Sequence, residues 1–356
     1  MSFNRLVADD FVVSTDSITA GLWGDSSTPN LSTFITSSAQ AAGSSGNYYL
    51  NVFSAGTSTG PSELEFAVTY GNSDGGGSLL FDSSVAERSP SSTIYGSYRT
   101  LVLGDENATF SFGGVTSSDF WAISIDRNRY KESLFPGSLT LIISGSDAAA
   151  GGGMLSLTDN SQIVTTTTFN DAGRVFQIVS GSAGTVFTGV NNNGYSLASG
   201  SYGFFLPDIA TLLLNPRAIT AGNTGVSKSF ADIKPVTTTN TDGNNPGILI
   251  RAISSSANPS PNPALPFTLN SQENITSDFV FVRPRSSEYN YSSNPSFISG
   301  STGEVLFNSF INNPQTYMTT VGLYNDTNEL LAVAKLSRPL PKDFTKEALV
   351  RVKLDF

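Results

Sequence analysis

The sequence predicts an all-β protein with two or more antiparallel domains of sandwich or barrel type, long loops and very little helix. One observation is the alternation of apolar and polar residues, which is typical of strands with one buried face and is clearest at Glu63–Tyr70 and Val350–Phe356. Another is a series of short apolar runs, each about five to ten residues long, between turns rich in Gly, Asn, Ser and Thr. Closely spaced turns of this kind favour antiparallel pairing of successive strands.

Residues 1–145 are predicted to form an N-terminal β domain. Its best-defined strand is Glu63–Tyr70, and Ser32–Ala42 is compatible with one or two helical turns. The other predicted strands are Phe11–Val13, Tyr48–Phe53, Leu79–Phe81, Ile94–Leu103, Thr109–Phe112, Phe120–Ile125 and Leu139–Ile143. The glycine-rich run at 145–153 is too flexible for the interior of an element, so it marks the end of this domain.

Residues 146–225 are predicted to form a middle β domain. Its predicted strands are Met154–Leu157, Ile163–Phe169, Val175–Val179, Thr185–Val190, Tyr202–Leu206 and Ile209–Leu214. Asn215 followed by Pro216 matches a helix N-cap and first helical position, which predicts a single helical turn through Ile219.

Residues 226–356 are predicted to form a loop-rich C-terminal region that ends in a hairpin and a terminal strand. Its predicted strands before that terminal strand are Ile248–Ile253, Phe279–Val282, Thr319–Tyr324 and Glu329–Leu336, the last two joined by a turn of Asn and Asp residues. The proline-rich segment Asn258–Pro266 is expected to be extended, either as an arm over another surface or as a linker. Pro339 and Pro341 lack backbone donors, so they are expected to end the hairpin pairing.

The composition argues against nucleic acid as a partner. Only 13% of the 356 residues are charged, against about a quarter in an average soluble protein, and the net charge is −10. An acidic chain repels phosphate, whereas nucleic-acid binding needs clustered cations. A chain that carries mainly neutral polar side chains is expected to face the outside or to be covered by partners.

The chain contains no cysteine and no histidine. Disulfides, thiol nucleophiles, Ser-His-Asp triads and histidine metal ligands are therefore excluded. No run approaches the ~18 apolar residues of a membrane helix, and the first residues lack the apolar core of a signal peptide. We expect no catalytic residue, no cofactor, no metal and no membrane partner. A pair of carboxylates for glycoside hydrolysis stays open, but no local pattern marks such a pair.

The terminal strand is the main candidate for an assembly contact. Its apolar side consists of Val350, Val352, Leu354 and Phe356, and its polar side includes Arg351 and Lys353. A terminal strand of this type is expected to be inserted into a sheet of the chain itself or of a neighbour. From Glu329 onward the chain has six cations and four acids, a surplus that suits an acidic copy or partner, the alternative being a solvated strand face.

Two further segments are candidate contact surfaces. The dense charge cluster at 126–132 includes Arg127, Arg129 and Tyr130, and arginine beside an aromatic residue is common at interfaces. The segment around Tyr289 and Tyr291 has the tyrosine, serine and asparagine composition of recognition surfaces. The alternatives are a solvated connection for the first segment and a covered loop for the second.

Five phrases along the sequence carry a resemblance to a known group of proteins. They are YYLNVF at 48–53, IYGSYRTLVLGDENA at 94–108, FWAISIDRNRYKE at 120–132, YGFFLPDIATLLLNPRAI at 202–219 and TTVGLYNDTNELLAVAKLSRPLPKDFTKEALVRVKLDF at the C-terminus. These phrases resemble virion structural proteins of contractile-tailed cyanophages.

The resemblance implies a non-enzymatic component of the tail or baseplate, assembled in the host cytoplasm and kept in the virion. The expected partners are other virion proteins and copies of the chain itself, joined through β-sheet contacts. A receptor- or glycan-binding tail adhesin, with a host-surface glycan as ligand, and a neck or capsid decoration protein are the alternatives.

Overall fold

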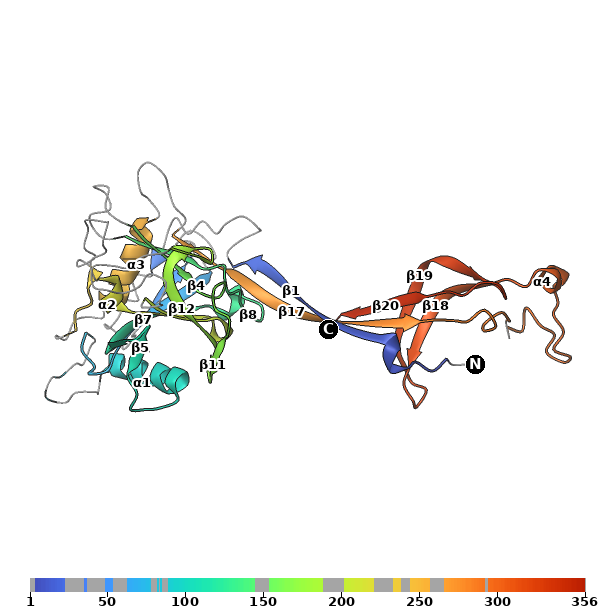
Figure 1. The fold of residues 1–356 in the computed structure, drawn as a ribbon, viewed down its shortest axis with the longest axis horizontal. Helices are drawn as coiled ribbons and strands as arrows, with labels where there is room; N and C mark the ends of the chain where they lie inside the picture. Colours follow the sequence, from blue (N-terminus) through green and yellow to red (C-terminus); the bar gives the residue numbers. More distant parts are fainter. Residues whose placement is uncertain are drawn as a thin grey trace. The chain divides into compact units, whose positions relative to one another are not determined.

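The computed structural model shows a chain of two compact units (Figure 1). Unit 1 consists of Met1–Ser17 and Asn274–Phe356, and unit 2 is Ile18–Glu273. The structure describes residues 4–22, 35–36, 49–53, 63–77, 82, 84, 89–144, 154–187, 202–220, 233–237, 244–256, 266–291 and 294–355. The predicted glycine-rich boundary at 145–153, the strand Leu79–Phe81 and nearly all of the proline-rich segment lie outside these residues.

Unit 2 is built around one large sheet. Along its main path the strand order is β16-β9-β10-β12-β14-β15-β7-β4-β3-β2, and β11 and β13 pair with β12. The strands are β2 (Ile35–Thr36), β3 (Tyr49–Phe53), β4 (Leu64–Asn72), β7 (Asp119–Ile125), β9 (Thr140–Ser144), β10 (Met154–Asp159), β11 (Thr168–Asn170), β12 (Gly173–Ser182), β13 (Thr185–Val186), β14 (Gly203–Leu206), β15 (Thr211–Leu214) and β16 (Phe267–Thr268). Neighbouring strands of this sheet pair antiparallel, which confirms the predicted all-β class.

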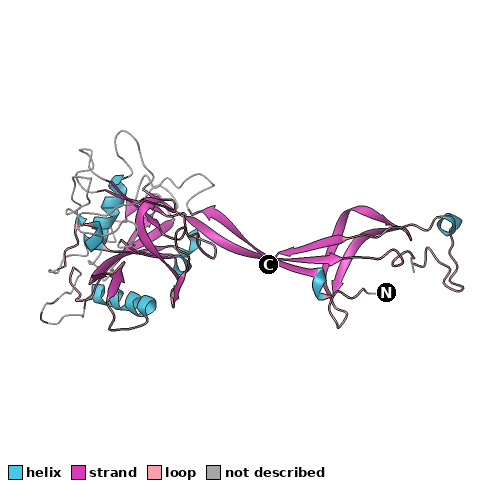
Figure 2. Cartoon of the chain, in the orientation of Figure 1, coloured by secondary structure: helices cyan, strands magenta, loops and turns pink. Residues whose placement is uncertain are grey.

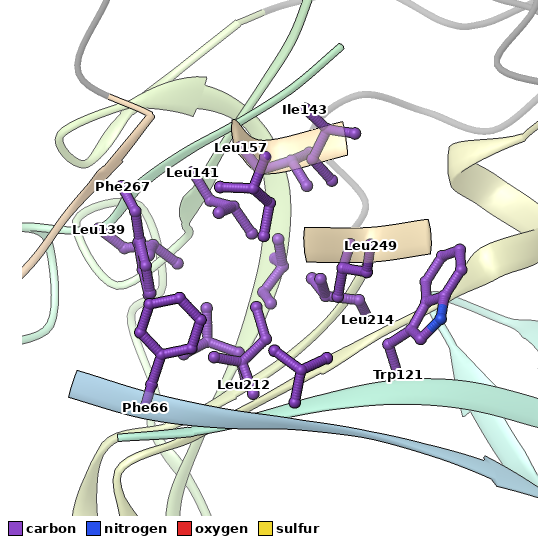
Figure 3. Close-up of a cluster of buried hydrophobic side chains, with 14 of the residues drawn as sticks. Phe66, Trp121, Leu139, Leu141, Ile143, Leu157, Leu212, Leu214, Leu249 and Phe267 are labelled. Atoms are coloured by element: carbon purple, nitrogen blue, oxygen red, sulfur yellow. The ribbon is translucent and has the colours of Figure 1, made fainter. Parts of the chain in front are cut away.

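The central strands of this sheet are buried on both faces. On β7, Trp121 and Ile123 lie in one apolar cluster, whereas Phe120 and Ala122 lie in another on the opposite face. Strands covered on both sides need apolar residues at every position, so the continuous apolar runs of β7 and β15 follow from this arrangement. Figure 3 shows part of the first cluster, in which Trp121 lies near Leu249.

Helices cover the two faces of the sheet. The helix α3 (Asn244–Ser256) contributes Leu249 and Ile253 to the first cluster, and α1 (Pro90–Leu103) contributes Tyr95 and Val102 to the second. The described part of unit 2 also contains three minor strands and three short helices: β5 (Phe110–Phe112), β6 (Val115–Ser117), β8 (Ser133–Leu134), η3 (Arg127–Arg129), η5 (Pro207–Ile209) and α2 (Pro216–Ile219). The helix α2 confirms the predicted turn, because the Asn215 side chain accepts a hydrogen bond from the Arg217 N–H at 3.1 Å.

Two strand predictions are wrong, because the segments form helices. Ile94–Leu103 forms most of α1, which has Pro90 in its first turn and ends at Gly104 in the left-handed conformation. Ile248–Ile253 lies in α3. Both runs have apolar residues at helical as well as strand spacing, and packing on the sheet selects the helix.

Smaller predictions in unit 2 also change. The strand expected at Ile163–Phe169 is reduced to its last two residues, which begin β11. Within Ser32–Ala42, the described residues Ile35 and Thr36 form a strand and not a helical turn. The two units do not meet at the predicted domain boundaries near residues 145 and 225. The large sheet of unit 2 contains strands from before and after each of these boundaries.

Unit 1 has two β layers (Figure 2). Its sheet has the order β1-β17-β20, and a separate hairpin consists of β18 and β19. Its elements are η1 (Ala8–Asp10), β1 (Phe11–Gly21), β17 (Asn270–Val282), α4 (Asn308–Asn312), β18 (Thr316–Tyr324), β19 (Leu330–Lys342) and β20 (Val350–Asp355), and β1 and β17 each contribute residues to both units. The hairpin packs Val321 and Leu323 against a small cluster around Val280 and Val352.

The hairpin turn is confirmed and its predicted end is wrong. The Asn325 side chain accepts hydrogen bonds from the N–H groups of Thr327 and Glu329, and Asn328 has a φ of 60°, as expected for this turn. The ladder is irregular between Met318 and Thr320, where Pro339 has no paired residue, but pairing resumes beyond it, with Leu340 opposite Met318 and Pro341 opposite Tyr317. In a two-stranded hairpin every second N–H points away from the partner, so a proline at such a position removes no hydrogen bond.

Candidate assembly surface

The terminal strand β20 forms one edge of a sheet of its own chain. It pairs antiparallel with β17, with Val350 opposite Val282 and Asp355 opposite Ser277. Val350 and Val352 are buried and Leu354 is partly buried, whereas Arg351 and Lys353 are exposed, which confirms the predicted alternation. Phe356 lies outside the described residues. The valines therefore stabilise unit 1 itself, and β20 offers a partner its outer backbone edge and its cationic side.

The cations of β20 lie over an aromatic ring. The guanidinium of Arg351 and the ammonium of Lys353 are 5.3 and 5.9 Å from the ring centre of Phe279 on β17. Lys353 also forms an ion pair with Asp355 at 2.8 Å. Hydrogen bonds from Lys353 and Ser277 lower the pKa of Asp355, so this carboxylate remains charged at neutral pH. Arg351 has no carboxylate partner within the part of the chain that the structure describes.

The 126–132 cluster is tied to unit 2 through Arg129. Its guanidinium forms ion pairs with Glu63 at 2.7 Å and with the buried Glu65 at 2.9 Å, and its Nε donates to the carbonyl of Leu64. Arg127 is exposed, donates to the carbonyl of Tyr130 and lies 4.7 Å from its ring centre. Arg129 therefore has a structural role, and contact of Arg127 and Tyr130 with a partner stays a prediction.

Replacing Arg129 with alanine is expected to lower the free energy of unfolding of unit 2 by about 3 kcal/mol, because the buried carboxylate of Glu65 loses its cation. Arg127→Ala, in the same short helix, is the matched control and is expected to cost less than about 1 kcal/mol, since its contacts are exposed. Urea denaturation of the two variants measures the difference. Equal losses would show that the Glu65 ion pair contributes nothing to stability.

A partly buried acid–phenol contact joins two strands of the large sheet. The hydroxyl of Tyr70 on β4 donates to the carboxylate of Asp119 on β7 at 2.9 Å. Burial raises the pKa of Asp119, although hydrogen bonds from Tyr70 and Ser117 act in the opposite direction. Burial, together with the charge of Asp119, also raises the pKa of Tyr70, so the phenol remains a donor. The two side chains therefore hydrogen-bond to each other and link the neighbouring strands β4 and β7.

Sequence reasoning missed one surface feature of unit 1, which is a set of exposed apolar side chains. On β1, every residue except Ser14 is exposed, and Val13 retains 67% of its accessible surface. The outward face of the hairpin carries Leu331, which is 68% exposed, and Val333. The run Phe11–Val13 could have indicated this surface, because consecutive apolar residues in a strand point to both faces and both faces then need to be covered.

The described residues contain no group of three or more acidic side chains that could hold a metal ion. None of the helices found in these residues is long and apolar enough to cross a membrane. Comparison of the chain with protein-family models, with curated proteins and with solved structures finds no match.

Proposed function

We propose that this chain is a non-enzymatic structural protein of a virus particle, a tail or baseplate component of a contractile-tailed phage. Its partners are copies of itself and other virion proteins, joined through β-sheet contacts. The resemblance of the five sequence phrases to virion proteins supports the assignment to a virus particle. The exposed strands of unit 1 support assembly as the activity.

The exposure of β1 is the observation that carries the proposal. Phe11, Val12 and Val13 are all exposed, although they alternate between the two faces of the strand. A strand exposed on both faces gains little from its own core, whereas a partner on either face would remove apolar surface from water. Extended apolar patches on a folded unit are typical of interaction sites.

Incorporation into particles tests the proposal. Tagged full-length chain is expressed in cells infected by a phage that carries the same protein, and purified particles are analysed by quantitative mass spectrometry. We expect Val13→Asp and Leu331→Asp to reduce incorporation at least tenfold, because a carboxylate at a covered apolar position must be desolvated. Both side chains are exposed in the free chain, so the free energy of unfolding is expected to change by less than about 0.5 kcal/mol.

Ile163→Asp is the matched control, because Ile163 is 54% exposed but belongs to unit 2. It is expected to be incorporated like the unchanged chain. Absence of the unchanged chain from purified particles contradicts the proposed function. Normal incorporation of both unit 1 variants contradicts the role of the exposed strands.

A tail adhesin is the second candidate, and exposed aromatic side chains favour it. Tyr289 and Tyr291 are both exposed, as are Leu306 and Phe307. Aromatic side chains of this kind bind sugar rings and protein loops. Direct binding of the purified chain to host cell envelopes, lost in Tyr291→Ala, would support the adhesin. A neck protein or a capsid decoration protein would also be a structural protein of the particle and would differ from the proposed tail or baseplate component only in its location.

A further inference from the structure

The sheet of unit 1 has two open edges. In the order β1-β17-β20, the strands β1 and β20 are the outer ones, and neither has a second partner within the described residues. Exposed edges are usually protected by prolines, lysines or bulges, because their free N–H and C=O groups pair with other chains. The eleven residues of β1 contain no proline and a single charged residue, Asp16. This edge is therefore available for pairing.

The two edges carry opposite charge. From Asn4 to Ser17 the chain has three acids, Asp9, Asp10 and Asp16, and one cation, Arg5. The strand β20 has two cations, Arg351 and Lys353, and one acid, Asp355, which pairs with Lys353, so its net charge is positive. Arg338 on β19 is also exposed. No ion pair joins Asp16 or Arg351 to another side chain of unit 1, as far as the structure describes it. Like charges opposite each other destabilise strand pairing, so β20 disfavours another β20 and favours an acidic strand.

We infer that β20 of one copy pairs along its open edge with β1 of the next copy, so that the sheet of β1, β17 and β20 continues from chain to chain. The inference rests on the proposed assembly function and specifies its partner, a second copy of this chain. The contact is heterologous, because it joins two different surfaces, and such contacts build rings when the rotation closes. Pairing covers one edge of β1, and the neighbouring copy also lies against the exposed side chains of Phe11 and Val13.

Engineered cysteines test the contact, because the chain contains none of its own. Full-length Val13→Cys chain is mixed with full-length Arg351→Cys, Lys353→Cys or Asp355→Cys chain, three positions that sample the pairing register. The mixtures are oxidised mildly and analysed on non-reducing gels. Within one chain, β17 separates these positions by two strand spacings, roughly 9.5 Å, which exceeds the reach of about 7 Å for a disulfide. Any disulfide therefore joins two chains.

We expect a cross-linked dimer in at least one of the three mixtures and in none of the single-variant samples. Ile163→Cys mixed with the same three chains measures random collision and is expected to stay uncross-linked. A dimer of Val13→Cys alone, or of a β20 variant alone, would overturn the heterologous contact. So would the absence of a cross-link above the Ile163→Cys background in all three mixtures.

A charge exchange provides a second test that leaves the backbone unchanged. Asp16→Lys is expected to weaken self-association at least tenfold in analytical ultracentrifugation, and adding Arg351→Glu in the same chain is expected to restore it. Weakening without rescue would overturn the proposed charge pairing. Because both tests use purified chain, cross-linking by a chain that never enters particles contradicts the proposed function alone, whereas incorporation without cross-linking contradicts this inference alone.

Discussion

Replacing Lys342 with alanine is expected to lower the free energy of unfolding of unit 1 by about 3 kcal/mol. Lys342 is fully buried at the end of β19. Its ammonium donates to the carbonyl of Ser286 at 2.9 Å, to the side-chain oxygen of Asn290 at 3.0 Å and to the carbonyl of Asp343 at 3.2 Å. The substitution removes these hydrogen bonds and the packing of the aliphatic stem, and it takes the lysine donor away from the buried side-chain oxygen of Asn290.

Thermal or urea denaturation of full-length protein measures this loss. Lys346→Ala is the matched control, since Lys346 is half exposed and pairs with Asp343 at 3.0 Å. Its substitution is expected to change the free energy of unfolding by less than about 1 kcal/mol. If Lys342→Ala were as stable as the control, the buried ammonium would not anchor the 286–290 loop to the hairpin.

Replacing Gly203 with alanine is expected to destabilise unit 2 by more than about 3 kcal/mol. Gly203 begins β14, where it is buried and has a φ of 150°, a conformation that residues with a side chain rarely adopt. A Cβ at this position would overlap the carbonyl oxygen of Leu213 on β15. That oxygen cannot move away easily, because Gly203 pairs with Leu214 and both strands lie in the middle of the sheet.

Gly96→Ala is the matched control for Gly203→Ala. Gly96 lies in α1, and an added Cβ meets nothing within 4 Å. Alanine there is expected to raise the free energy of unfolding by about 0.5 to 1 kcal/mol, because it favours the helical backbone. Opposite changes in the denaturation midpoints of the two variants support the packing of β14 on β15. A Gly203→Ala protein as stable as the unchanged chain contradicts it.

The strands with a clear pattern could be predicted from sequence. Alternation placed Val350 and Val352 on the buried side of β20, and the Asn-Asp turn placed the hairpin of β18 and β19. These signals are local, since the period of two and the turn chemistry are written in neighbouring residues. The helix α1 had local signals too, in Pro90 and Gly104, but its apolar run also fitted a strand.

The candidate surface was harder to predict, because burial depends on partners that are distant in sequence. Nothing near Lys342 indicates that a charged side chain after Pro341 is buried, since its oxygen partners come mainly from residues 286 and 290. The predicted contact residue Arg129 is held by Glu63 and Glu65, which lie more than sixty residues away. Likewise, the apolar run Phe11–Val13 could equally have belonged to a core strand, and only the fold shows that it is exposed.

The position of this chain in an image of the intact particle, at a resolution that separates strands, tests the proposed function most directly. We expect several copies in a symmetric arrangement within the tail or baseplate, with Phe11 and Val13 of each copy covered by a neighbouring chain. A particle that lacks the protein, or one in which β1 of every copy faces solvent, would contradict assembly as its activity.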